Sequence, residues 1–184
     1  MSMPKNPLKI IDFISLWTGR AVSFFMYVIA GLICYDVILR YAFHNPTIWV
    51  LETSFMIFGG YFMVAGAYNL FIGGHVKLDI VYRRLSLRTQ GILDSITFVF
   101  FFVFIGILFW QGYDFAAESW RVREINPDSV WKPAFYPIKT AIPVAVGLLG
   151  LQGLAEFTRS IYQAVTGKVM SRLEYAPLGP VASE

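Results

Sequence analysis

Apolar positions run along the chain in four long blocks, each with few charged residues. Every block is longer than the ~20 residues that an α-helix needs to cross the hydrocarbon core of a bilayer. A longer helix tilts or extends into the headgroups. We therefore predict an all-α membrane protein with four long, tilted transmembrane helices at residues 18–43, 47–72, 90–119 and 137–164.

The segments around these blocks are more polar or amphipathic. Residues 1–17 contain an apolar cluster ending at Trp17, which predicts a cytoplasmic interfacial segment that leads into the first span. Residues 74–88 combine apolar and basic positions at helical spacing, so we expect an amphipathic helix on the anionic inner leaflet, with phospholipid as a partner. Residues 119–136 are interpreted as a periplasmic loop and residues 165–184 as a cytoplasmic tail. The interfacial basic helix contains His75, Lys77, Asp79, Arg83, Arg84 and Arg88.

Composition supports the membrane class and argues against an enzyme. The chain is 57% hydrophobic and 15% charged, with a mean hydropathy of +0.58, whereas a soluble domain has about 25% charged residues. The single cysteine, Cys34, leaves no pair for an intramolecular disulfide. His44 and His75 fall on opposite sides of the membrane, and no phosphate loop, zinc-protease motif or Ser-His-Asp set is evident. We therefore expect no catalytic residues, cofactor, metal or nucleic-acid partner for this chain.

The distribution of positive charge predicts how the spans are oriented. Most of the 15 lysine and arginine residues lie on the side of the termini. The positive-inside rule therefore places both termini in the cytoplasm. The basic residues expected on the opposite side are Arg40, Arg121, Arg123, Lys132 and Lys139.

Charges within the first hairpin need a partner or a function, because an unpaired charge in a bilayer is costly. Asp36 and Arg40 are one helical turn apart and could pair locally, whereas Arg40 and Glu52 could pair across the turn at Pro46. Glu52 could also be a proton or cation site. It lies only about 8 Å inside the predicted start of its helix. This shallow depth favours a structural ion pair or a contact with a partner subunit.

A second polar set lies near the other ends of the spans. Asp94 opens the third span and Arg20 begins the first. Three polar residues recur at helical spacing near the end of the fourth span, namely Gln152, Glu156 and Arg159. We expect these side chains to form an inner polar ring that ties the spans together.

Several motifs, taken in order, resemble those of a known family. The first hairpin contains Arg40-Tyr41-Ala42-Phe43 followed by Pro46, Trp49 and Glu52. Gly74-His75-Val76-Lys77-Leu78-Asp79 follows the second span. The fourth span contains Pro137-x-Lys139, Ile142-Pro143 and Leu148-Leu149-x-Leu151-Gln152. Together they resemble the small (Q-type) membrane subunit of tripartite ATP-independent periplasmic (TRAP) transporters, over nearly the whole chain.

The resemblance implies a subunit of a heteromeric transporter in the bacterial inner membrane. In this family a periplasmic (P-type) binding protein captures a solute, commonly an organic acid, and a large multi-helix (M-type) subunit moves it inward with sodium. The small subunit braces the large one, so sodium is expected in the large partner. Residues expected at the large-subunit interface or in structural ion pairs are Asp36, Arg40, Trp49, Glu52, Asp94 and Glu156. Residues expected to face the binding protein are His44, Trp120, Arg121, Arg123, Trp131 and Lys132.

One alternative function is an independent, small proton-coupled exporter of the multidrug type. Glu52 would then be the proton carrier, because an acid within a membrane span commonly marks such a site. One test distinguishes the two functions. If the isolated chain is an exporter, it should carry out proton-coupled efflux, and replacing Glu52 by Gln should abolish that efflux.

Overall fold

The four apolar blocks form long helices in the computed structural model, which describes residues 7–72 and 85–170. The helices are α1 (Pro7–Ala42), α2 (Trp49–Phe71), α4 (Leu87–Val122), the short α5 (Tyr136–Lys139) and α6 (Ala141–Thr166). With α5 and α6 taken together, four of them are long and apolar enough to cross a membrane. Apart from one isolated bridge between Ile125 and Ala134, the regular secondary structure of the described residues is helical. The predicted all-α fold with four spans is confirmed.

Local signals set the ends of the helices. α4 begins after Ser86, whose hydroxyl accepts a hydrogen bond from the backbone N–H of Thr89 at 3.3 Å, as an N-cap residue does. α6 ends at Gly167, which takes the left-handed conformation (φ 68°) that suits glycine. Arg123 takes the same conformation at the end of α4 (φ 48°). The next residue secures that turn, because the Glu124 N–H donates to the carbonyl of Ser119 at 3.0 Å.

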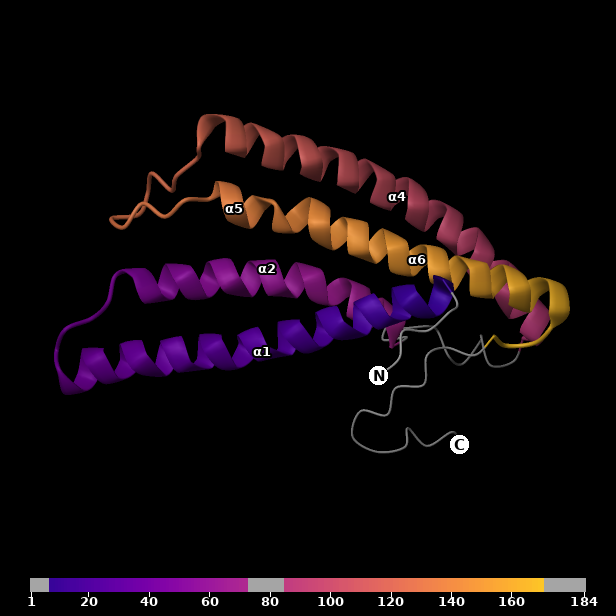
Figure 1. Ribbon diagram of the computed structural model, residues 1–184, viewed down its shortest axis with the longest axis horizontal. Coiled ribbons are helices and arrows are strands. Elements are labelled where there is room, and N and C mark those ends of the chain that lie inside the picture. Colours follow the sequence, from indigo (N-terminus) through magenta and orange to yellow (C-terminus); the bar gives the residue numbers. More distant parts are fainter. Residues whose placement is uncertain (1–6, 73–84, 171–184) are drawn as a thin grey trace.

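The helices lie side by side in a single layer, in the order α1, α2, α6 and α4 (Figure 1). α2 packs between α1 and α6, and α4 packs on the other side of α6. α1 also contacts α6 directly, where its first turns cross one end of the layer. We call this end, at which α1 begins and α6 ends, the inner end, and the opposite end the outer end.

Glycines allow α4 and α6 to approach closely. A Cβ atom on Gly91 would lie 2.5 Å from the backbone nitrogen of Ala164 and 2.8 Å from the carbonyl oxygen of Ser160. The two backbones therefore nearly touch near the inner end, as small residues permit between membrane helices. Farther along, the Phe101 ring covers Gly153. Aromatic contacts complete this interface through Phe98, Phe101, Phe102 and Phe157.

A single layer buries little apolar surface. Between 6% and 28% of the most apolar part of each span is buried. Large side chains such as Phe100 and Trp110 are 72% and 70% exposed. In a membrane, such a surface contacts lipid or another protein.

Predicted boundaries differ from the structure at both ends of the layer. At the outer end, α4 continues to Val122, so Trp120 and Arg121 lie in this helix and not in the predicted loop at 119–136. The sequence predicts a separate segment that ends at Trp17, whereas α1 is one continuous helix from Pro7 to Ala42. The helix continues because its first turns pack against α6 through buried polar side chains, described below. Of the predicted interfacial helix at 74–88, the structure describes residues 85–88, and Arg88 lies in the first turn of α4. The other residues named for that helix lie outside the described part of the chain, namely His75, Lys77, Asp79, Arg83 and Arg84.

Candidate functional site

A buried polar cluster joins α1 to α6 near the inner end of the layer. Two residues from α1 and three from α6 form it, and each is between 0% and 6% exposed. The α6 members share one helix face because they are spaced by four and three residues. We call this group the inner polar cluster; it consists of Asp12, Ser15, Gln152, Glu156 and Arg159.

Arg159 links the two carboxylates of the cluster. Its Nη2 donates to Asp12 Oδ2 at 2.6 Å, and its Nη1 donates to Glu156 Oε1 at 2.8 Å. The Gln152 amide makes a parallel link, since Nε2 donates to Asp12 Oδ1 at 3.2 Å and Oε1 accepts from the Ser15 hydroxyl at 2.8 Å. One guanidinium and one amide thus connect residues as far as 147 positions apart in the sequence.

The inner polar cluster holds the first turns of α1 against α6. Removing one partner of a buried ion pair typically costs about 3–5 kcal/mol, because the other charge stays buried. Within the described part of the chain, Arg159 Nε has no hydrogen-bond partner. The guanidinium therefore holds Glu156 and Asp12 through Nη1 and Nη2. Because its members are at most 6% exposed, the cluster holds helices together and is closed to a solute.

The structure shows how the α6 members of the predicted inner polar ring are held. Its three members on α6 share the cluster, but their partner on α1 is Asp12, which the sequence reasoning missed. Asp94 is half-buried on α4 and Arg20 is exposed on α1. A usable signal was present, because Asp12 is an acid between the apolar residues Ile11 and Phe13 and such an acid needs a partner.

At the outer end, Asp36 fixes the turn between α1 and α2. Its carboxylate accepts a hydrogen bond from Arg40 Nη2 at 2.9 Å and one from the Thr47 N–H at 3.0 Å. The Thr47 hydroxyl donates to the same carboxylate. Arg40 therefore pairs within α1. Of the two pairings that the sequence leaves open, the structure has the local one with Asp36.

Glu52 instead binds the loop that follows α4. Ser129 Oγ donates to Glu52 Oε2 at 2.6 Å, and it accepts from the N–H groups of Trp131 (3.0 Å) and Lys132 (3.3 Å). Ser129 is 6% exposed, so this junction between α2 and the loop excludes most water. Sequence reasoning missed Ser129 because it lies 77 positions from Glu52 in a segment without helical periodicity.

The loop at residues 123–135 folds back on itself as a short hairpin. The Asn126 N–H donates to the carbonyl of Pro133 at 3.0 Å, and the Phe135 N–H donates to the carbonyl of Glu124 at 2.9 Å. These bonds flank the isolated bridge within the loop. The loop therefore has a defined shape and does not simply span the gap between helices.

An ion pair fastens this loop to the fourth span. Lys139 Nζ donates to Glu124 Oε2 at 2.5 Å. The same ammonium lies 3.9 Å from the centroid of the Phe115 ring on α4, within the range of a cation–π contact. The hydrogen bond from Lys139 is the main cause that lowers the pKa of the Glu124 carboxyl below its ordinary value. Glu124 is therefore ionised at neutral pH.

The residues predicted to face a binding protein are exposed at the outer end of the layer. Trp120 and Trp131 are 50% and 45% exposed. Arg121 pairs with Glu118 at 2.7 Å along the surface of α4. Three of these residues adopt left-handed φ angles of 48° to 50°, namely His44, Arg123 and Lys132. Their contact with a binding protein stays a prediction.

Charged side chains avoid the central part of every span. None lies between Arg20 and Asp36 on α1, between Asp94 and Asp114 on α4, or after Glu52 on α2. The fourth span has none between Lys139 and Glu156. In residues 7–72 and 85–170, no three His, Cys, Asp or Glu side chains group in a way that could hold a metal ion. The described spans therefore present apolar surface at their centre.

The chain matches the model of one protein family. The model of the family described as "Tripartite ATP-independent periplasmic transporters, DctQ component" matches residues 29–163. This range begins within α1, includes α2, α4 and α5, and ends within α6. No curated protein matches the chain.

Proposed function

Because the chain belongs to the DctQ family, the small membrane component of tripartite ATP-independent periplasmic transporters, we propose that it braces the large subunit of such a transporter. It is a multi-pass membrane protein and a transporter component. In the proposed division of work, the large subunit moves an organic acid or a similar solute, and a sodium gradient drives uptake. This chain supplies support and holds neither sodium nor solute.

The single layer of helices is the observation that carries this proposal. Secondary transporters bind their substrate near the midplane, typically between helices that are broken there. Here the described helices are continuous through the central part of the layer, where they carry no charged side chain. Much of their apolar surface is exposed. A flat layer of this kind suits packing against a larger membrane protein, where close contact replaces the hydrophobic effect.

The internal bonds of the layer indicate which residues are available to a partner. Asp36, Glu52 and Glu156 are each hydrogen-bonded within the layer. Arg40 pairs with Asp36 but leaves 51% of its side chain accessible, and Trp49 is 39% exposed. We therefore favour Arg40 and Trp49 as contacts with the large subunit and assign the three carboxylates to holding the layer in shape.

We further propose that the protein lies in the bacterial inner membrane with both termini in the cytoplasm. The excess of basic residues on the side of the termini supports this orientation. It directs Trp120 at the end of α4, and Trp131 and Lys132 in the outer loop, toward the periplasm. A periplasmic binding protein could reach these side chains there.

Reconstitution tests the proposed function. We expect the chain to co-purify with a much larger membrane subunit. Proteoliposomes that contain both, supplied with the binding protein and an organic acid that it binds, should take up that acid under an inward sodium gradient. Vesicles with this chain alone should take up none. Uptake by the chain alone, or full uptake by the large subunit without it, would contradict the proposal.

The alternative exporter depends on Glu52. The hydrogen bond from Ser129 and the position of Glu52 at the outer end favour a structural role for this acid. We therefore expect Glu52→Gln, which still accepts a hydrogen bond, to support uptake in the complex at close to the normal rate. Proton-coupled efflux by the isolated chain that disappears in Glu52→Gln would establish the exporter instead.

A further inference from the structure

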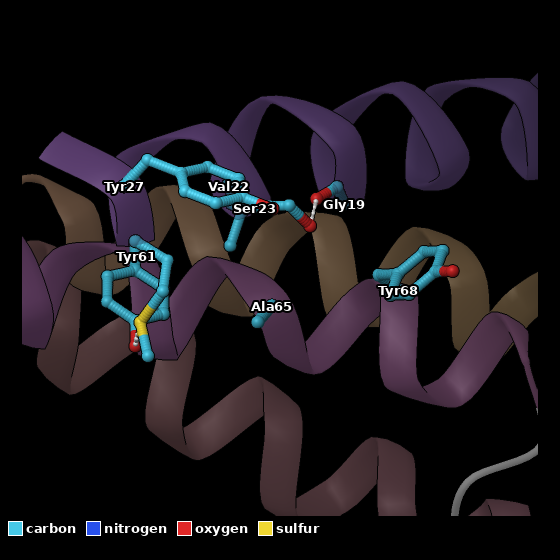
Figure 2. Close-up of a pocket in the computed structure, with 8 residues that line it drawn as sticks. Gly19, Val22, Ser23, Tyr27, Tyr61, Ala65 and Tyr68 are labelled. Carbon is cyan, nitrogen blue, oxygen red and sulfur yellow. Dashed lines mark hydrogen bonds between the residues drawn. The ribbon is translucent and has the colours of Figure 1, made fainter. Parts of the chain in front are cut away.

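The function proposed above does not use a groove on the hairpin of α1 and α2. The groove has a volume of about 440 Å³. Figure 2 shows its lining side chains, with those of α1 facing those of α2. We call it the tyrosine groove; its main lining residues are Gly19, Ser23, Tyr27, Tyr61, Ala65 and Tyr68.

Side-chain size explains why the groove exists. The Tyr68 ring packs on Gly19 at the inner end, where a Cβ atom on the glycine would lie 2.4 Å from the ring. Toward the outer end, the Tyr61 hydroxyl donates to the sulfur of Met26 at 3.4 Å. Between these two contacts the small Ala65 leaves space. Tyr68 and Tyr61 thus lie at the two ends of the tyrosine groove.

Two hydroxyl groups that line the groove already have hydrogen-bond acceptors within the protein. The Ser23 hydroxyl donates to the carbonyl of Gly19 at 2.9 Å (Figure 2), so it does not require water. The Tyr61 hydroxyl already has the Met26 sulfur as its acceptor. An apolar occupant is therefore compatible with the walls, because no buried hydrogen bond must be broken to admit it.

The dimensions of the groove match one acyl chain. From Gly19 to Tyr27 the groove extends about 12 Å along α1 by helical rise, close to the ~15 Å of hydrocarbon in one leaflet. A methylene group is about as large as a water molecule, roughly 30 Å³, so the volume accommodates about 15 of them. An α-helix, ~10 Å wide, would lie mostly outside a groove of this volume, whereas a single acyl chain is thin enough to enter it. Lipid fits better than another helix.

Basic residues lie at the inner end of the same face of α1. Lys9 and Arg20 are 18 and 7 positions before Tyr27, and spacings of 7 and 11 residues bring side chains to nearly the same angle on a helix. Arg20 is exposed and Lys9 is half-buried. Arg20 follows Gly19 directly, at the inner end of the groove, where the phosphate of a phospholipid in that leaflet would lie. Lys9 adds positive charge about 16 Å farther toward the inner end by helical rise.

We propose that the tyrosine groove binds an acyl chain of an anionic phospholipid from the leaflet at the inner end. The phosphate lies beside Arg20, and the chain runs from Tyr68 toward Tyr61. This inference rests on the geometry of the hairpin and does not depend on the transport function proposed above.

A photoactivatable lipid tests the groove. The purified transporter complex is placed in nanodiscs containing phosphatidylglycerol with a diazirine in one acyl chain, and the labelled peptides are identified by mass spectrometry. We expect labelling to concentrate on the peptides with residues 19–27 and 61–68. Ala65→Phe should lower it by about tenfold, since excluding two methylene groups is already worth that much. Ser23→Leu, which fills the groove from the other wall, should do the same.

Gly66→Phe is the matched control, because a Cβ on Gly66 meets nothing within 4 Å. It adds the same ring at the next position of α2, and labelling should stay unchanged. All variants are compared at equal recovery of the complex. Even labelling of all spans, or labelling that Ala65→Phe and Ser23→Leu both leave intact, would overturn the proposal. Lipid label on the large subunit with none on these peptides would also overturn it, because the groove would then be covered by protein.

The charge at the inner end has a separate test. In Arg20→Gln, labelling by phosphatidylglycerol should fall by about fivefold, because one basic residue near an anionic lipid contributes about that much. A diazirine phosphatidylcholine with the same acyl chains should lose much less. Equal behaviour of the two lipids would contradict the assigned position of the phosphate and the preference for an anionic headgroup.

Discussion

Individual buried side chains decide how α1 meets α6, and Arg159 matters most because it serves two carboxylates. We expect Arg159→Gln to lower the free energy of unfolding by about 3–5 kcal/mol, since Asp12 and Glu156 would lose their charged partner while buried. Denaturant titration of the purified protein in detergent measures this. Adding Asp12→Asn should restore part of the loss, because one buried charge is then removed. An unchanged midpoint in Arg159→Gln would show that the ion pairs do not stabilise the layer.

Two glycines of α4 test how closely this helix approaches α6. Gly91→Ala should destabilise the protein by about 1–3 kcal/mol, because its Cβ would collide with the backbone of α6 at Ala164. Gly106→Ala in the same helix is the control, because nothing lies within 4 Å of a Cβ there. Its stability should stay equal or rise slightly, as alanine favours a helix over glycine. Equal effects of the two substitutions would contradict the close approach of α4 and α6.

At the scale of elements, the loop after α4 depends on the charge of Glu124. Its pKa is lower in the folded state than the ordinary 4.5, so it stabilises the loop fully above about pH 4.5. The stabilisation disappears as the pH falls through the lower folded-state pKa. We measure hydrogen exchange at the Phe135 amide and correct it for the intrinsic pH dependence of exchange. Protection of this amide should persist until the pH falls to the folded-state pKa of Glu124 and should decrease at lower pH.

Glu124→Gln should remove this pH dependence, because the amide cannot ionise. Glu118→Gln is the control, since Glu118 pairs with Arg121 on the surface of α4 and not with the loop. Protection that falls at the same acidic pH in Glu124→Gln would assign the dependence to another group.

The elements differ in how far the sequence predicts them. Long apolar runs predict four spans because a bilayer requires their length. The start of α1 was not predictable, since it depends on Asp12 meeting Arg159, a residue 147 positions away. The partner of Glu52 was missed for the same reason, because Ser129 lies in an aperiodic loop. Local pattern predicts where a helix runs through the membrane. It does not reveal which distant side chain completes a polar pair.

For the whole molecule, the flat arrangement explains why the spans show no narrow polar face in the sequence. A four-helix bundle surrounds a core, whereas this layer contacts its surroundings on both faces. The Phe-rich block in α4 illustrates this, because Phe100 and Phe104 are 72% and 62% exposed while Phe101 packs on α6. Apolar side chains all round the helix are therefore expected, and periodicity could not predict which neighbours pack together.

The orientation of this layer determines where each of its polar regions acts. Starting from Cys34→Ser, which removes the single cysteine, we place one cysteine in the outer loop (Asp128→Cys) or after α6 (Lys168→Cys). A membrane-impermeant maleimide added to intact spheroplasts should label the first, and the second only after permeabilisation. The reverse pattern would contradict the positive-inside assignment. The expected result places the Glu52–Ser129 junction beside the periplasm. The inner polar cluster and the tyrosine groove would then lie in the leaflet where anionic lipids meet basic residues.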